Sequence, residues 1–167
     1  MLVNERHAEF SLFFSPEPIE PGDTILFFKG NEVLLRARTE TGRLPLWGEL
    51  AGAFAGVLPC HAFTQGARRF FIASAKEDAP APPGFAWENV RVFRTLLPEE
   101  DGAMLNAAYH LAGWYKNHRF CGACGGTLHA DSEERSLTCE RCGLTVYPSI
   151  LPAVIVAVTD GSRLLLA

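Results

Sequence analysis

The apolar residues change their spacing along the chain, from short consecutive runs near its start to a helical repeat in its middle. Residues 24–29 (TILFFK) and 32–37 (EVLLRA) are two apolar runs that flank Gly30-Asn31. Two such runs around a Gly-Asn turn predict a β-hairpin. Residues 69–73 (RFFIA) predict a further strand, whereas residues 42–56, rich in Gly, Ala and Leu, permit no assignment.

A helical repeat follows a segment, residues 90–94, that is predicted to be extended. Pro98 suits the first position of a helix, and acidic residues 99–101 precede basic residues at its end, which is the polarity that the helix dipole favours. Residues 98–117 are therefore predicted to form one long helix that packs on the core and performs no chemistry. Its apolar positions are Met104, Ala107, Ala108, Leu111, Trp114 and Tyr115.

Two Cys-x-x-Cys motifs form the most specific pattern in the chain. Fourteen residues separate the pair Cys121–Cys124 from the pair Cys139–Cys142. Each motif is a short turn that directs two sulfurs to one point, and four thiolates complete the tetrahedral coordination of a structural zinc ion. We therefore predict one zinc ion per chain, with no open position for catalysis. The glycines that would permit the tight turns are Gly122, Gly125 and Gly143.

Other interpretations of the cysteines are less economical. A disulfide or a redox Cys-x-x-Cys does not require two matched motifs, and a rubredoxin-type iron centre would use the same four ligands. His118 and His129 lie close in sequence, but four cysteines already saturate a tetrahedral site. Cys60, the fifth cysteine, is expected to be a small buried apolar residue.

An apolar run follows the cysteine motifs. Residues 150–158 (ILPAVIVAV) predict a buried strand, Asp160-Gly161 predicts a tight turn, and residues 163–167 predict a return strand. Because this apolar hairpin has no partner in the remaining sequence, we expect the chain to be part of a longer protein. The elements together predict an α+β fold with a mainly antiparallel sheet and one long helix.

The amino-acid composition limits the classes of protein to which this chain can belong. The 167 residues are 48% hydrophobic and 20% charged, with a formal net charge of −4, which is typical of a globular protein. No run of Lys and Arg exceeds two residues, which argues against a basic nucleic-acid-binding arm. No apolar run approaches the ~20 residues of a membrane-spanning helix. Charged residues near the start argue against a signal peptide, and the expected location is the cytoplasm, where thiols stay reduced.

The ribbon and the segment behind it resemble a known family. Cys-Gly-x-Cys-Gly, the fourteen-residue spacer, Cys-x-x-Cys-Gly, Tyr147-Pro148 and residues 152–156 (PAVIV) resemble the NADH pyrophosphatase branch of the Nudix hydrolases. That branch includes enzymes that remove NAD caps from RNA. The resemblance implies an N-terminal domain over residues 1–118, a zinc ribbon over 119–148, and the first hairpin of a Nudix domain over 149–167.

The resemblance also implies an activity for the parent protein. Members of this branch hydrolyse the pyrophosphate of NAD(H) or NAD-capped RNA to a nicotinamide mononucleotide and AMP, using Mg²⁺ or Mn²⁺ held by the carboxylates of the Nudix box. The pattern G-x5-E-x7-R-E-U-x-E-E-x-G-U, where U is aliphatic, does not occur in this chain. We therefore expect the chain to be inactive alone, and to serve substrate positioning and formation of a homodimer.

Four residues match substrate-contacting positions of the family, which makes them candidate substrate-binding residues. Tyr147 stands directly before Pro148, and Glu134 lies ten residues after Cys124. Lys29 belongs to a lysine-glycine turn, and Arg91 precedes the long helix. The plainer interpretations are exposed charged residues for Lys29, Arg91 and Glu134, and core packing for Tyr147.

The four cysteines alone also permit a different class of function. A non-enzymatic zinc-ribbon module would bind nucleic acid or a protein partner. Recognition of nucleic acid normally requires a basic footprint, and the acidic balance of this chain argues against sequence-specific DNA binding.

Overall fold

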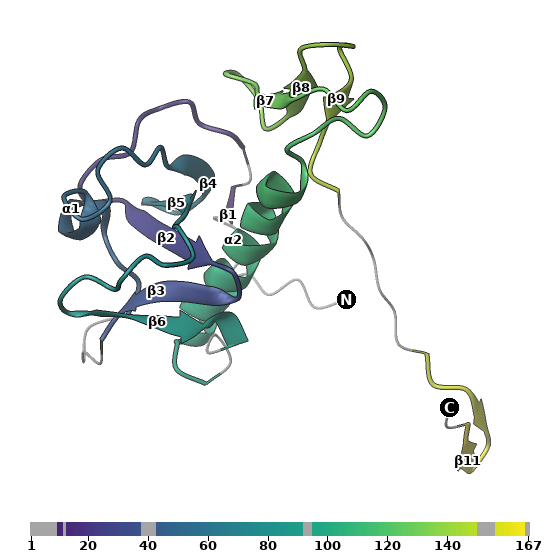
Figure 1. The fold of residues 1–167 in the computed structure, drawn as a ribbon. Coiled ribbons are helices and arrows are strands. Elements are labelled where there is room, and N and C mark those ends of the chain that lie inside the picture. Colours follow the sequence, from purple (N-terminus) through teal and green to yellow (C-terminus); the bar gives the residue numbers. More distant parts are fainter. Residues whose placement is uncertain (1–9, 12, 38–42, 92–94, 150–155, 166–167) are drawn as a thin grey trace.

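The computed structural model describes residues 10–11, 13–37, 43–91, 95–149 and 156–165 (Figure 1). They form a mixed α+β fold, as the sequence predicted. The elements are β1 (Phe10–Ser11), β2 (Thr24–Lys29), β3 (Glu32–Arg36), α1 (Trp47–Leu50), β4 (Cys60–Gln65), β5 (Arg68–Ser74), β6 (Phe85–Asn89), α2 (Glu99–Asn117), β7 (Leu128–Ala130), β8 (Leu137–Cys139), β9 (Thr145–Val146), β10 (Thr159–Asp160) and β11 (Arg163–Leu164).

Six strands make one sheet in the order β1-β4-β5-β2-β3-β6. All neighbours are antiparallel except β2 and β5, which pair in parallel from Thr24 opposite Phe70 to Phe28 opposite Ser74. A parallel pair requires a long connection, and the chain through β3, α1 and β4 supplies it. The predicted mainly antiparallel sheet is therefore confirmed, with one parallel pair at its centre.

The strands that the sequence predicted are present, and others were missed. The hairpin forms as β2 and β3, with Lys29 opposite Glu32 across Gly30-Asn31, and the strand at 69–73 lies within β5. Residues 47–50 of the unassigned segment form α1, while residues 38–42 lie outside the described part. Strand β4 was missed because His61, Thr64 and Gln65 interrupt its apolar pattern, although His61 and Gln65 are buried.

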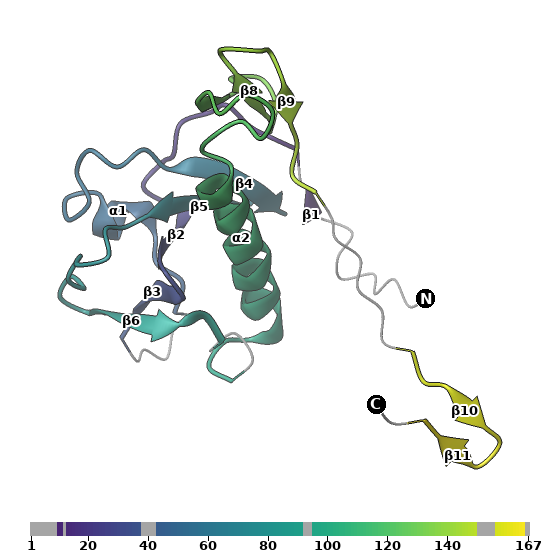
Figure 2. The same ribbon diagram turned by 45° about the vertical axis from the view of Figure 1, so that its right-hand side comes forward.

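Helix α2 covers one face of the sheet (Figures 1 and 2). Met104, Leu105 and Ala108 are buried against sheet residues, which include Leu26, Phe28, Val33, Leu35, Phe63, Phe70 and Ile72. The predicted helix is confirmed, except that Pro98 is the N-cap residue and not the first helical residue. The packing of its apolar stripe explains why the helix is stable.

The segment before α2 differs from its prediction. Residues 92–94 lie outside the described part, and Val90 and Arg91 form a helical turn where the sequence predicted an extended strand. The reason is local, because the side-chain oxygen of Asn89 accepts the backbone N–H of Arg91 at 3.0 Å and turns the chain at the end of β6.

The opposite face of the sheet is covered by α1 and the turns that follow it. Ile25, Phe27, Leu34 and Phe71 point to this side and pack against Leu50 and Phe54. The rings of Phe27 and Phe54 stack at a centroid distance of 4.0 Å. Because both faces of β2 are covered, its residues from Thr24 to Phe28 are all buried, which explains the continuous apolar run in the sequence.

The ribbon follows α2 directly and forms a three-stranded sheet in the order β7-β8-β9. After it, β10 and β11 make a two-stranded hairpin that lies apart from the rest in both ribbon views (Figures 1 and 2). Of the predicted strand at 150–158, residues 150–155 lie outside the described part and residues 156–158 are in no strand. The turn is Gly161-Ser162, one residue later than predicted, because Asp160 pairs with Arg163.

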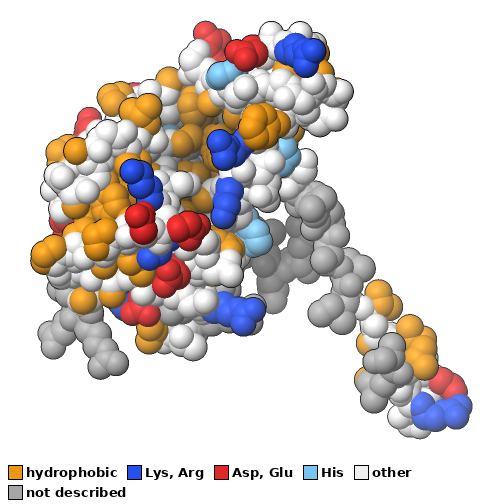
Figure 3. Space-filling view, in the orientation of Figure 1, with side chains coloured by type: hydrophobic (Ala, Val, Ile, Leu, Met, Phe, Trp, Pro, Cys, Tyr) orange, Lys and Arg blue, Asp and Glu red, His pale blue; other side chains and the backbone are white. Residues whose placement is uncertain are grey.

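No helix in the described ranges is both long and apolar enough to cross a membrane. The domain boundaries proposed from the sequence, between residues 118 and 119 and between residues 148 and 149, remain predictions. On the face shown in Figure 3, acidic and basic side chains are interspersed, so this face has no continuous basic stripe.

Candidate functional site

The four predicted zinc ligands lie together in the ribbon. The sulfur atoms of Cys121, Cys124, Cys139 and Cys142 are all within 4.8 Å of one another. The Sγ atoms of Cys121 and Cys142 are 3.7 Å apart, and those of Cys124 and Cys139 are 3.5 Å apart. A tetrahedral zinc ion with Zn–S bonds of ~2.3 Å requires sulfurs about 3.8 Å apart. The donor set and its geometry therefore fit a structural zinc ion.

The backbone of each Cys-x-x-Cys motif closes into the same kind of turn. The carbonyl oxygen of Cys121 accepts the N–H of Gly125, and that of Cys139 accepts the N–H of Gly143, both at 2.9 Å. Gly125 and Gly143 have φ angles of 73° and 74°, a region that side chains disfavour. These two glycines were predicted correctly, whereas Gly122 does not have a positive φ.

Gly126 is a further requirement of the site that the sequence analysis missed. A Cβ atom on Gly126 would lie 2.9 Å from Cβ of Arg141 and 3.1 Å from Sγ of Cys139. Only a residue without a side chain fits there without displacing the second pair of ligands. The signal was the doubled glycine after Cys124, which one left-handed turn alone does not require.

The four thiols of the cluster differ in acidity. The backbone N–H groups of Cys124 and Ala123 lower the pKa of the Cys121 thiol to about 7. The backbone N–H of Gly126 also lowers the pKa of Cys124, but hydrogen bonds with the neighbouring sulfurs outweigh it and raise that pKa to about 12. The guanidinium of Arg141 donates to the carbonyl oxygen of Cys124 at 3.1 Å, which adds positive charge beside the sulfurs. His118 bonds the backbone oxygen of Trp114 at 2.8 Å, and His129 pairs with Glu140 at 3.1 Å, so both histidines have partners outside the cluster.

The ribbon is attached to the sheet domain through α2. Cys121, Leu128, Leu137 and Cys139 form its small core, and Trp114 and Tyr115 from the end of α2 pack against it. Cys60 of β4 lies on the other side of this contact, half-buried, with its thiol 3.2 Å from the Tyr115 hydroxyl. Burial raises the pKa of the Cys60 thiol, so it remains protonated. Cys60 packs against the core as expected, but it is half-buried and not fully buried.

Two of the four candidate substrate-binding residues lie side by side. The hydroxyl of Tyr147 donates to Oε1 of Glu134 at 2.9 Å, and both side chains are exposed. The carboxylate of Asp131 accepts the N–H groups of Glu133 and Glu134 and fixes the loop that presents Glu134. The hydrogen bond to Glu134 raises the pKa of Tyr147, so the phenol stays protonated. We call these two residues the Tyr147–Glu134 pair.

Lys29 and Arg91 belong to the sheet domain and not to the ribbon, because Lys29 is the last residue of β2 and Arg91 follows the end of β6. The Lys29 ammonium is 3.4 Å from Glu32 and 4.6 Å from the centre of the Trp87 ring, so its charge is already engaged. Arg91 is exposed beside the β2–β3 turn and α2. In the part of the chain that the structure describes, neither residue contacts the Tyr147–Glu134 pair.

Arg91 lines a groove that the sequence analysis did not anticipate. The groove has a volume of about 780 Å³, and we call it the Arg91 groove. Three asparagines converge on it from the β2–β3 turn, the end of β6 and α2, which no local sequence pattern signals. Its polar lining residues are Asn31, Asn89, Arg91, Asn106, Tyr109 and His110.

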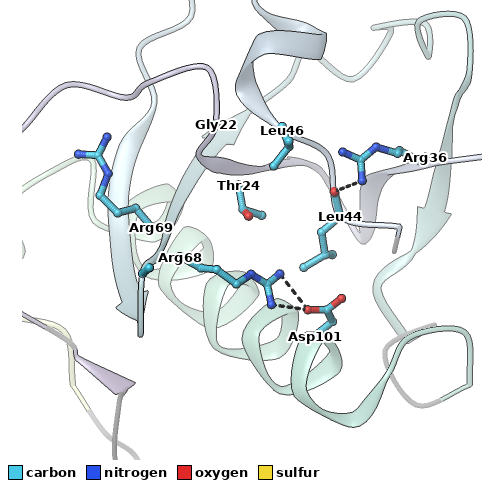
Figure 4. Close-up of a pocket in the computed structure, with 9 residues that line it drawn as sticks. Gly22, Thr24, Arg36, Leu44, Leu46, Arg68, Arg69 and Asp101 are labelled. Atoms are coloured by element: carbon cyan, nitrogen blue, oxygen red, sulfur yellow. Dashed lines mark hydrogen bonds and ion pairs between the residues drawn. The ribbon is translucent and has the colours of Figure 1, made fainter. Parts of the chain in front are cut away.

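A second pocket, of about 280 Å³, lies between β2, β3 and the start of α2 (Figure 4). Its arginines all have acidic partners. Arg36 pairs with Glu49 at 2.6 Å, Arg68 with Asp101 at 3.0 Å, and Arg69 with Asp23 at 2.5 Å. These pairs connect β3 to α1, and β5 to α2 and to the residue before β2, which makes this pocket a structural junction.

Comparison with known proteins identifies the metal-binding segment. The family model described as the NADH pyrophosphatase zinc ribbon domain matches residues 116–147, which contain all four cysteines. The ribbon is of the NADH pyrophosphatase type. The resemblance recognised in the sequence is therefore confirmed for this branch, and the cluster of four cysteines is its zinc site.

Curated relatives of this NADH pyrophosphatase branch carry the name NAD-capped RNA hydrolase NudC. The protein of Stutzerimonas stutzeri is 41% identical over 91 residues, 54% of this chain and 33% of the relative. That of Pseudomonas aeruginosa is 40% identical over 85 residues, 51% and 31% respectively. That of Pseudomonas syringae pv. tomato is 44% identical over 87 residues, 50% and 30%. The matched part of the chain thus spans about a third of these relatives.

Proposed function

We propose that this chain is the N-terminal and zinc-ribbon portion of an enzyme that hydrolyses the pyrophosphate of NAD(H) or NAD-capped RNA. NAD(H) gives a nicotinamide mononucleotide and AMP. With NAD-capped RNA, the nicotinamide mononucleotide is released and the AMP half remains as the 5′-monophosphate end of the transcript. The observation that carries the proposal is the NADH pyrophosphatase ribbon at residues 116–147, whose four sulfurs have the spacing that zinc requires. Relatives named as hydrolases of NAD-capped RNA support the substrate class.

The zinc ion has a structural role in this proposal, and the Tyr147–Glu134 pair contacts the substrate. Zinc holds β8 and the loop behind it, which position Glu134 and Tyr147. The Tyr147 ring, 54% exposed, offers a face on which a base stacks, and the Glu134 carboxylate accepts a hydrogen bond from a ribose hydroxyl or a base amino group. Lys29 and Arg91 are proposed as further contacts to the phosphates or to the transcript.

The catalytic metal ions belong to the rest of the proposed enzyme. Mg²⁺ or Mn²⁺ at a Nudix box would neutralise phosphate charge and activate water. The described residues contain no four-carboxylate arrangement of that kind, and the part represented here would bind and orient. A homodimer in the cytoplasm is the proposed state, in which the exposed Tyr147 would face the nucleotide site of the partner.

The test uses the whole protein expressed from its complete reading frame, with Mg²⁺ or Mn²⁺. We expect cleavage of NADH, NAD-capped RNA or both, detected as release of nicotinamide mononucleotide. Tyr147→Ala should lower kcat/KM about tenfold or more, because stacking contributes ~1–3 kcal/mol per base. Tyr147→Phe is the matched control, since it keeps the ring and removes only the hydroxyl.

Absence of cleavage with either substrate would contradict the proposal. Salt-dependent binding of RNA without cleavage would favour the alternative, a non-enzymatic zinc-ribbon module. An equal loss of activity in Tyr147→Ala and Tyr147→Phe would assign the role of Tyr147 to its hydroxyl and overturn stacking.

A further inference from the structure

Directly after Glu134, the ribbon carries a half-buried arginine that reaches the sheet domain. Nη2 of Arg135 lies 3.5 Å from the backbone carbonyl oxygen of His61 in β4, and the two residues are 74 positions apart. The positive charge of Arg135 also acts on the Cys60 thiol and the Tyr115 hydroxyl, which are 3.2 Å apart. Arg135 therefore connects the loop that presents Glu134 to β4, beside the end of α2.

The acceptor of this contact lies where the pairing of β4 is incomplete. The register of β4 against β5 shifts between His61 and Phe63, which is a β-bulge. On the other edge of β4, the described pairing with β1 covers only Thr64 and Gln65. Bulges and unpaired strand edges both leave backbone groups without partners in the sheet. The carbonyl oxygen of His61 is therefore open to a side chain from the ribbon.

An arginine is not the residue that stability alone would favour at this contact. Its guanidinium has no ion pair within the described ranges, and its Nε atom is buried without a hydrogen-bond partner. Burial lowers the pKa of Arg135, so the surroundings disfavour its charged form. A buried charge without a carboxylate partner costs free energy that an apolar side chain of similar volume would not. The contact therefore indicates a role other than stability.

The position of Arg135 in the loop points to that role. The carboxylate of Asp131 accepts the N–H of Glu134 at 3.1 Å and fixes the loop before the Glu134 side chain. Arg135 fixes the same loop after it, through the contact with β4. Between these two anchors, the exposed Glu134 carboxylate accepts the Tyr147 hydroxyl at 2.9 Å. Without Arg135, the loop would be held on one side of Glu134 only.

We propose that Arg135 is a positioning residue for the substrate, which anchors the loop to β4 and so holds Glu134 beside Tyr147. The proposal rests on the proposed function, because that function assigns the substrate contact to the Tyr147–Glu134 pair. Arg135 is half-buried in the contact with the sheet domain and acts through Glu134, without touching the substrate itself.

The first part of the test needs no activity. The hydrogen bond to Glu134 raises the pKa of Tyr147, and NMR of ring-labelled tyrosines in the zinc-loaded chain follows this titration. Arg135→Met keeps most of the side-chain length but removes every N–H donor. It should lower the Tyr147 pKa towards the ordinary value of a tyrosine, as Glu134→Gln does, while the stability stays equal or rises. Lys116→Ala removes the same charge from an exposed position and should leave the Tyr147 pKa unchanged.

The second part measures kcat/KM of the whole protein in a double-mutant cycle. Glu134→Ala should lower kcat/KM about tenfold, the usual effect of one hydrogen bond to a charged group. Arg135→Met should lower it by up to the same factor, and Arg135→Lys, which keeps a donor and the charge, should recover most of the loss. Because Arg135 acts through Glu134, adding Arg135→Met to Glu134→Ala should cause no further loss.

The same Tyr147 pKa in the wild type and in Arg135→Met would overturn the proposal. Losses that multiply in the double variant would also overturn it, since Arg135 would then act independently of Glu134. The two proposals fail separately. Cleavage of NADH with multiplying losses refutes only the positioning role. Absence of cleavage refutes the proposed function, and the titration then decides by itself whether Arg135 holds Glu134 beside Tyr147.

Discussion

The sheet domain and the ribbon are stabilised by different means. The sheet buries apolar side chains on both faces, against α2 on one side and against α1 with its following turns on the other. The ribbon has a core of only Cys121, Leu128, Leu137 and Cys139, and two of these four residues are zinc ligands. A core of this size cannot offset the entropy of ordering about thirty residues. The ribbon therefore depends on its metal, and the sheet domain does not.

The largest effect that separates the two regions should come from a zinc ligand. Cys139→Ser removes a buried thiolate, and structural zinc contributes roughly 10 kcal/mol or more to the folding of small metal-binding domains. We expect loss of zinc and unfolding of the ribbon, with the sheet retained, measured by elemental analysis and by NMR spectra. Cys60→Ser is the matched control and should keep one zinc per chain. Full zinc content in Cys139→Ser would contradict the four-thiolate site.

A substitution in the core of the sheet domain should lower the stability of that domain without affecting zinc binding. Phe27 is fully buried and stacks on Phe54, so Phe27→Ala should lower the free energy of unfolding of the sheet domain by about 3–5 kcal/mol. Chemical denaturation monitors the loss, and zinc content should be unchanged at low denaturant. Loss of zinc in parallel with the sheet would show that the two regions unfold as one unit.

A smaller effect is expected from a substitution that crowds the zinc site but keeps all four ligands. Gly126→Ala places a methyl group 2.9 Å from Arg141 and 3.1 Å from the Cys139 sulfur, a degree of overpacking that costs about 1–3 kcal/mol. We expect weaker zinc binding, measured by competition with a chelator. Gly122→Ala, within the nearby Cys121–Cys124 motif, is the matched control. Its methyl group meets nothing within 4 Å, so this variant should bind zinc as the wild type does. Equal affinities for the two variants would disprove the close approach at Gly126.

The smallest expected effect concerns pH and the sheet domain. Burial in β4, together with the positive charge of Arg135, lowers the pKa of His61 from its usual 6.5 to about 4. Protonation therefore favours the unfolded state, so His61 should reduce stability progressively as pH falls from 6.5 towards 4, and should have no effect above that window. His61→Gln should flatten this part of the stability profile relative to the wild type. Identical profiles between pH 4 and 6.5 would contradict a neutral buried His61.

The features that the sequence predicted correctly are those encoded over short distances. The zinc ligands follow from two four-residue motifs, the β2–β3 hairpin from two runs around Gly30-Asn31, and α2 from its apolar repeat. The features that were missed depend on contacts between distant segments. Strand β4 carries a buried polar residue, His61, whose Nδ1 accepts the backbone N–H of Ser15, 46 residues away in the sequence.

The candidate substrate-binding residues also show that sequence patterns predict contacts within one short segment better than contacts between distant segments. Glu134 and Tyr147 lie in one small ribbon, and their spacing around the cysteines places them together. Lys29 and Arg91 precede α2, and nothing in their sequence neighbourhoods indicates whether they contact the pair. The Arg91 groove requires three segments to meet, and each of its asparagines alone resembles an ordinary turn or surface residue.

Hydrogen exchange with and without a zinc chelator tests the contrast between the two regions most directly. After chelation, we expect the amides of residues 119–148 to exchange rapidly, including those of Gly125 and Gly143, whose hydrogen bonds close the two cysteine turns. The amides of β2 and β5 should keep their protection. Uniform loss of protection throughout the sheet, or full protection of the ribbon after zinc is removed, would contradict the account.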